Sequence, residues 1–340
     1  MKQLFSKFPP FRVFEDRDFE LLESLGQKKK YQSGTVLIDG GKSASSIYVC
    51  FSGNLAVTMS LQEVSDQELT TFSAGEIIGE NLLLKQQGAT VTVKESAELL
   101  VLPKEQLTKS LQQDRDFAAR FYHFLSICLS ERLRKLTKLM AARNVKEGEP
   151  LRKVLVVFAT LNDSDIAWIV ANGVAEKFAQ GSALIQQDQA VPDVYLLLEG
   201  MLGIYVSIPA ENGTVLEKEI AKRVKGEILG EMSFVDGGVA SASVKSLEKA
   251  WVLALPQKKL AAKFKEDRGF AERFYRSLVL ILSNRYLDLL VRGSLADSGQ
   301  SSMEMLSEGI EVEDELDLDF LEGTAIAGSR FDWMIQQLRR

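Results

Sequence analysis

The sequence contains little of what metal centres and catalytic sites require. Among its 340 residues are two cysteines, Cys50 and Cys128, and a single histidine, His123. The cysteines lie far apart and show no metal-type spacing, so the sequence offers no Cys/His ligand set for zinc. We expect both to be core thiols of a reduced, cytoplasmic protein, and His123 to occupy an ordinary helix position.

Long apolar runs are also missing. No stretch approaches the roughly 20 apolar residues that a membrane helix needs, and the start, MKQLFSKFPPF, lacks the apolar segment of a signal peptide. No glycine-rich loop runs into Lys-Ser or Lys-Thr, and no spacing marks a pair of catalytic carboxylates. We therefore expect a protein that is not an enzyme, spans no membrane and holds no metal or cofactor.

Positive charge is not concentrated anywhere, as it would be in a protein that binds nucleic acid. The net charge is −6, and residues 304–322 contain nine Asp and Glu residues with no Lys or Arg, so the remainder carries about +3. The one basic run, Lys28 to Lys30, is interpreted as a solvated loop. We do not expect DNA binding.

An internal repeat organises the chain. Gly34 and Gly181 lie in similar segments 147 positions apart, and DRDFAARFYHFL from Asp114 matches DRGFAERFYRSL from Asp267 at a distance of 153. An offset that changes only by small loop insertions indicates duplication. The length independently suggests about two domains.

Each half shows the same order of predicted elements. A short helix comes first, at Asp16–Leu25 or Asp163–Asn172. Short apolar runs broken by glycine follow, and these are typical of a small antiparallel barrel. An amphipathic helix ends each half. The predicted fold is mainly β with flanking α: two tandem, jelly-roll-like β-rolls, each followed by a helix. The apolar stripes of these helices either cover their own roll or also pair in self-association.

Two related stretches stand out within the repeat. GENLLLKQQGATVTV begins at Gly79 and GEMSFVDGGVASASV at Gly230. Each predicts a strand, a tight turn that glycine permits, one short helix and another strand. The free N–H groups at the start of such a helix favour an anion.

This pattern resembles the phosphate-binding cassette of cyclic-nucleotide-binding domains, a family that includes bacterial catabolite-activator-type regulators and the regulatory subunits of protein kinase A. In that family a Glu binds the ribose 2′-hydroxyl and an Arg pairs with the cyclic phosphate. Glu80 and Glu231 match the Glu, whereas Ala89 and Ala240 stand at the Arg positions. The resemblance thus implies the fold, but a cyclic nucleotide is not favoured as ligand. The ligand positions it implies are Gly79, Glu80, Asn81, Ala89, Thr90 and Thr92 in the first cassette, and Gly230, Glu231, Met232, Ser233, Ala240, Ser241 and Ser243 in the second.

The predicted domains are 1–143 and 161–292, with a linker at 144–160, an acidic, flexible tail at 293–328 and an amphipathic helix at 329–340. Alternation within Leu316–Phe320 suits a strand added to a sheet edge. The final helix is too short to be stable alone, so it docks on its own body or on a partner. The expected docking residues are Leu316, Leu318, Phe320, Phe331, Trp333, Met334, Ile335 and Leu338.

Two hypotheses for function follow. The first is a bacterial regulatory or adaptor protein for signal transduction, which acts through contacts with other proteins. The alternative is a sensor of a cyclic nucleotide or another small ligand, which uses mainly the second domain through Glu231, Ser233 and Ser243.

Overall fold

A computed structural model describes residues 5, 7–40, 45–59, 67–80, 89–142, 155–209, 214–297 and 318–339. The chain forms two compact units, Met1–Cys128 with Asp297–Gln300, and Leu129–Ala296 with Ser301–Arg340. The boundary lies inside helix α4, Arg115–Ala142, whereas the sequence analysis places it at 144–160.

The first unit begins with a short 3-10 helix, Pro9–Val13, and α2, Asp16–Leu25, as expected for the start of this half. Its strands are β1 Gln27–Tyr31, β2 Val36–Ile38, β3 Ser46–Ser52, β4 Leu55–Met59, β5 Gln67–Phe72, β6 Ile77–Ile78, β7 Thr90–Val93 and β8 Ala97–Pro103. Helices α3, Lys104–Gln113, and α4 follow.

The second unit repeats this order. It has helices α5 Val156–Thr160 and α6 Asp163–Asn172, then strands β9 Val174–Phe178, β10 Ala183–Ile185, β11 Asp193–Glu199, β12 Leu202–Pro209, β13 Val215–Arg223 and β14 Ile228–Leu229. After α7 Glu231–Asp236 come β15 Ser243–Ser246, β16 Ala250–Pro256, α8 Gln257–Glu266 and α9 Arg268–Asp297, and α11 is Leu318–Leu338.

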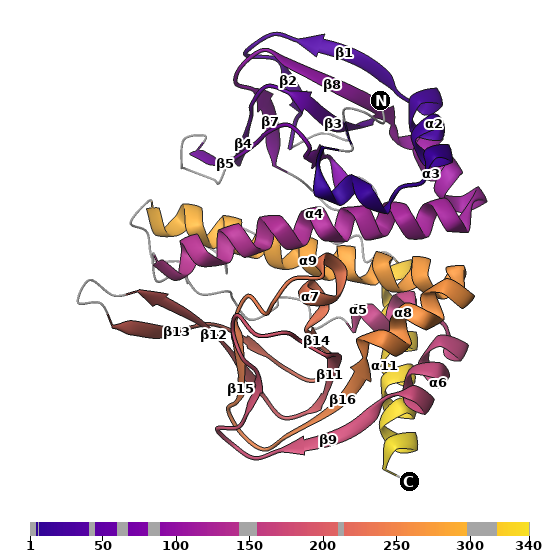
Figure 1. Cartoon of the computed structure of the whole chain (residues 1–340), viewed down its shortest axis with the longest axis vertical. Helices are drawn as coiled ribbons and strands as arrows, with labels where there is room; N and C mark the ends of the chain where they lie inside the picture. The colour runs from indigo at the N-terminus through magenta and orange to yellow at the C-terminus, as the bar shows by residue number, and fades with distance from the viewer. Residues whose placement is uncertain are drawn as a thin grey trace. The chain divides into compact units, whose positions relative to one another are not determined.

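Both units have the same sheet topology. The sheet order β1-β8-β3-β6 corresponds to β9-β16-β11-β14, and β2-β7-β4-β5 corresponds to β10-β15-β12-β13 (Figure 1). Even the bulges repeat: the register shifts between Val36 and Ile38 and, 147 positions later, between Ala183 and Ile185. The prediction of two repeated, mainly β domains with flanking helices is confirmed.

Each unit packs its core between its two sheets. In the second unit this core includes Leu197 and Val252 from one sheet and Leu202 and Val206 from the other, all fully buried. Burial of such aliphatic side chains stabilises a fold by about 1.5–3 kcal/mol each. The small sheets are therefore held in place by one another.

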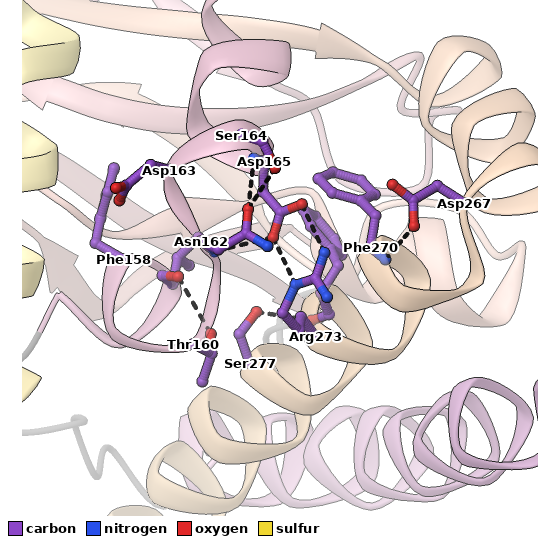
Figure 2. A network of polar contacts seen from close by, with 12 residues as sticks. Phe158, Thr160, Asn162, Asp163, Ser164, Asp165, Asp267, Phe270, Arg273 and Ser277 are labelled. Carbon is purple, nitrogen blue, oxygen red and sulfur yellow. Dashed lines mark hydrogen bonds and ion pairs between the residues drawn. The ribbon is translucent and has the colours of Figure 1, made fainter. Parts of the chain in front are cut away.

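An ion pair that is largely shielded from solvent joins α2 to α4 in the first unit and α6 to α9 in the second. In the second unit, Arg273 donates from Nε and Nη2 to Asp165 on α6, at 2.6 and 2.8 Å (Figure 2). Asp165 also accepts from the backbone N–H of Asn162, which caps α6 in return. Arg120 and Asp18 make the same two bonds, at 2.6 and 2.8 Å, in the first unit. The pair positions the helices relative to each other in both copies.

The C-terminal helix α11 lies beside α5 and α6 of the second unit (Figure 1). Phe331 and Met334 are buried, and the ring of Phe331 meets that of Phe158 edge-on at 5.2 Å. Arg330 donates to Asp163 at 2.6 Å and to the carbonyl of Phe158 at 2.9 Å. In this structure α11 therefore docks on the protein's own second unit.

Several expectations about individual segments were wrong. The final helix begins at Leu318 rather than at 329, so Leu318–Phe320 is helical and not a strand; Leu316 lies outside the described residues. The remaining expected docking residues differ in burial: Phe331 and Met334 are buried, whereas Trp333 is 40% exposed and Ile335 and Leu338 are half-buried. The Lys28 to Lys30 run belongs to the exposed strand β1, and α5 occupies part of the expected linker.

We predict that Asp165→Asn lowers the free energy of unfolding of the second unit by about 3 kcal/mol, the lower end of the cost of breaking a buried pair, because Arg273, whose side chain is 23% exposed, loses the carboxylate that it bonds. Asp163→Asn, whose side chain is 88% exposed, should cost less than about 1 kcal/mol. Urea denaturation can be followed by tryptophan fluorescence, since Trp168, Trp251 and Trp333 all belong to the second unit. Equal losses for the two variants would contradict the assignment.

We also predict that Phe331→Ala destabilises the second unit by about 3–5 kcal/mol, because a fully packed aromatic ring is replaced by a cavity. Ile326→Ala is the matched control on the same helix, since Ile326 is 47% exposed. The same urea titration measures both variants. If Phe331→Ala behaved like Ile326→Ala, docking of α11 would contribute nothing to stability.

Candidate functional site

The second cassette has the local structure that its sequence predicts. Gly230 ends β14 with a left-handed backbone, φ 76°, and α7 starts at the next residue. A side chain at Gly230 would meet the carbonyl oxygen of Asp193 at 2.7 Å, so this turn requires glycine. A second left-handed glycine, Gly237, ends α7 at φ 67°.

A small cavity lies against this cassette. Its volume is about 80 Å³. The lining residues come from α7, the strands around it and α9, and they are Ile185, Val191, Ile204, Arg223, Ile228, Leu229, Gly230, Glu231, Met232, Ser233, Ala240, Ser241, Ala242, Val244 and Arg285. Ligand pockets commonly measure about 300–1,000 Å³, so the cavity in this conformation is smaller than a nucleotide-sized site.

The charged side chains of the cavity are already paired. Arg285, from α9, donates from Nη1 to Glu231 at 2.6 Å and from Nη2 to the carbonyl of Ile228 at 3.0 Å. Arg223 lies 3.8 Å from Glu227 and donates to the carbonyl of Lys222. Both arginines are more than nine-tenths buried. The lining itself therefore holds two guanidinium groups and one carboxylate, and Glu227, which does not line the cavity, lies within 4.0 Å of both arginines. Each guanidinium already has a carboxylate partner.

Most of the positions expected in the second cassette converge on this cavity: Gly230, Glu231, Met232, Ser233, Ala240 and Ser241. Ser243 does not line it, and its hydroxyl accepts from the backbone N–H of Gln187 at 3.0 Å. Ala240 is held by its backbone, which donates to the carbonyl of Gln189 and accepts from the N–H of Asp188. The side chain of Ala240 is 4% exposed.

The first cassette is described only at its two ends. Gly79 has φ 91° and Glu80 is buried, as at the second cassette. Ala89 packs against the core of the first unit, and the hydroxyl of Thr90 accepts from the N–H of Gly40 at 3.1 Å. Thr92 lies within β7. Asn81 falls outside the described residues.

Sequence reasoning missed Arg285, the residue that pairs with the cassette glutamate. A signal was available: Arg132 and Arg285 occupy the same place in the repeat, 153 positions apart, inside apolar helical stripes. A charged residue kept at such a place in both copies needs a buried partner. Lys245, on β15 directly after the cassette, pairs with Glu217 at 2.6 Å.

Burial shifts the pKa of two ionisable groups near the cores. Burial raises the pKa of the Cys50 thiol to about 11, with Glu76 adding to the shift. Burial likewise raises the pKa of Tyr195, beside Gly230, to about 12. Both groups stay protonated near neutral pH. Within the described parts of the chain, no Asp, Glu, His and Cys cluster could hold a metal, and no helix is long and apolar enough to cross a membrane.

The family follows from comparison of the sequence with known domains. Residues 28–114 and 175–267 each match the sequence model of the cyclic nucleotide-binding domain, and together they cover more than half of the chain. The protein therefore belongs to the cyclic nucleotide-binding domain family, with two tandem copies. The resemblance drawn from the cassettes is confirmed.

Individual relatives are distant. The chain is 28% identical to the anaerobic regulatory protein of Bacillus subtilis (strain 168) over 125 residues. These aligned residues are 36% of this chain and 52% of that protein, so the chain spans about half the relative's length. Among solved structures, the regulatory domain of Toxoplasma gondii PKA with cAMP is 17% identical, with 80% of this chain and 92% of that one covered and a TM-score of 0.29. The N-terminal domain of a transcriptional regulator from Streptomyces coelicolor A3(2) is 24% identical, with 40% and 94% covered and a TM-score of 0.34.

We predict that Glu231→Gln lowers the free energy of unfolding of the second unit by about 3 kcal/mol, because the buried Arg285 loses its nearest carboxylate and keeps only Glu227, at 4.0 Å. Glu217→Gln, whose ion pair with Lys245 is more than one-third exposed, should cost less than about 1 kcal/mol. The double variant Glu231→Gln/Arg285→Met should recover part of the loss, as urea denaturation would measure. Simple additivity of the two single changes would show that the pair is not coupled.

Proposed function

We propose that this protein is a non-enzymatic regulator that acts through contacts with other proteins, and that neither cassette binds a cyclic nucleotide with useful affinity. The observation that carries the proposal is that both arginines of the second cavity are already paired, Arg223 with Glu227 behind the lining and Arg285 with Glu231. A ligand with a negative charge would leave this group of four charges with a net charge of −1.

The energetic cost of that imbalance is large. Each hydrogen bond to a charged group is worth about 1.5–3 kcal/mol. Ala240 stands where the resembled cassette has an arginine that makes two such bonds to the phosphate. Their loss costs roughly 3–6 kcal/mol of binding free energy, or about two to four decades of affinity. Recruiting Arg285 for a phosphate would in turn leave Glu231, which is 3% exposed, without its partner.

The shape of the site supports the same conclusion. The cavity beside Ala240 has a volume of about 80 Å³, and the ion pair of Arg285 and Glu231 forms part of its wall. A nucleotide needs more room than this conformation provides. The size of the cavity and its paired charges favour a role in which the domains serve as binding surfaces.

The alternative is a sensor of a small ligand in the second unit. Ser233 lines the cavity and is 6% exposed, and Ser241 makes only a 3.9 Å contact to the sulfur of Met232. These hydroxyls could serve an uncharged ligand. Such a ligand would need no cation, but it would still compete with Arg285 for Glu231.

Isothermal titration calorimetry of the full chain with cyclic AMP and cyclic GMP tests the proposal. We predict no binding at micromolar concentrations to the unmodified protein. Ala240→Arg should tighten binding at least tenfold, because its guanidinium would enter the cavity, while Ala240→Met controls for the added bulk. Micromolar binding by the unmodified chain would overturn the proposal and support the sensor.

A further inference from the structure

Arg134 binds the cassette of the second unit from outside the cavity. Arg134, in the part of α4 that belongs to this unit, donates from Nε and Nη2 to Asp236 at 2.7 and 3.1 Å. Its Nη1 donates to the carbonyl of Val239 at 2.9 Å. Asp236 is the last residue of α7, and Val239 directly precedes Ala240. One guanidinium thus spans the turn that leads from α7 back to the cavity wall.

Asp236 collects further donors at the same place. Ser130, one helical turn before Arg134, donates its hydroxyl to Asp236 at 2.8 Å, and the backbone N–H of Gly238 donates at 2.9 Å. The side chains of Arg134 and Asp236 are only 21% and 12% exposed. Pairs with this bidentate, charge-assisted geometry are the strong and orienting ones. The turn itself contains Gly237 and Gly238, which impose little order of their own.

The same helix segment is also part of the core of the second unit. Ala141 is 1% exposed and packs in the cluster that includes Ala240 and Ala242. Lys218, on β13, donates from Nζ to the carbonyl of Ala141 at 3.2 Å. The end of α4 therefore contacts the second unit at two places, the turn after α7 and strand β13.

The repeat does not contain these contacts in both copies. At the offset of 153 that relates the closing helices, Arg134 corresponds to Leu287. At the offset of 151 that relates the cassettes, Asp236 corresponds to Lys85. Neither charge of the pair has a counterpart in the other copy, so the pair distinguishes the second cassette from the first.

We propose that residues 129–142 form a strap that holds the second cassette in one conformation, so that movement of this helix segment, rather than entry of a ligand, opens the cassette and its cavity. The proposal does not depend on whether a cyclic nucleotide binds. In this proposal the end of α4 controls the conformation of the cassette, whereas in a ligand-regulated domain a ligand inside the cavity would control it.

Hydrogen exchange of the full chain, measured by mass spectrometry, tests the strap. Arg134→Ala should speed exchange of the amides in 232–240 about tenfold and leave the strands β11 and β16 nearly unchanged, because local opening exposes only the released turn. Lys135→Ala is the matched control, since Lys135 is the exposed neighbour on the same helix. Asp236→Asn should reproduce the effect from the other side, and combining it with Arg134→Ala should add little.

Thiol labelling provides a second readout, which reports opening at the cavity wall itself, while the regional pattern of hydrogen exchange separates local opening from destabilisation of the whole unit. Cys50 and Cys128 are buried, so Ala240→Cys supplies one reporter at the cavity wall. Arg134→Ala should raise its labelling rate by maleimide about tenfold, and Arg134→Lys should give an intermediate rate. The proposal would be overturned if Arg134→Ala gave the same labelling and exchange rates as Lys135→Ala. It would also be overturned if exchange in Arg134→Ala rose equally throughout the second unit.

Discussion

The bidentate pair between an aspartate and an arginine, repeated in both units, is the contact on which the helices of each unit depend. Burying the two charges costs several kcal/mol per ion, and only good geometry with further hydrogen bonds offsets that cost. Asp165 has both, because Arg273 meets it with two bonds and the cap of α6 adds another. Because α11 is attached to Asp163, two residues away, the position of α6 also decides where the last helix docks.

The same pair sets the position of the residue that closes the cavity. Arg285 lies on α9 twelve residues after Arg273, roughly 18 Å further along the helix axis. Once Arg273 is held by Asp165, the guanidinium of Arg285 arrives beside Glu231. The carboxylate of the cavity, Glu231, is therefore paired with a residue of a helix whose placement is determined elsewhere in the unit.

Much of the fold could be predicted from the sequence because repetition and periodicity are local signals. The bounds of α2 and α6 agree with those expected from the residue pattern, and the cassette glycines indicated the turn before α7. The repeat marks Arg285 as a charged residue that needs a buried partner. That this partner is Glu231 depends on how α9 packs over the roll, which no short-range pattern encodes. The segment from Leu318 was misread because alternating Leu and Asp suits a strand as well as the start of a helix.

The exposed lysines of β1 bear on the behaviour of the protein at high concentration. β1 stands at the end of its sheet and pairs with β8 alone, and Gln27 to Lys30 are exposed. An unpaired strand edge is a template on which another chain can add, and charged side chains, lysine above all, discourage that addition. Three consecutive lysines therefore keep the first sheet from growing beyond its own chain. Replacing these lysines with apolar residues that favour β-strands would cause aggregation before it changed the structure of the folded unit.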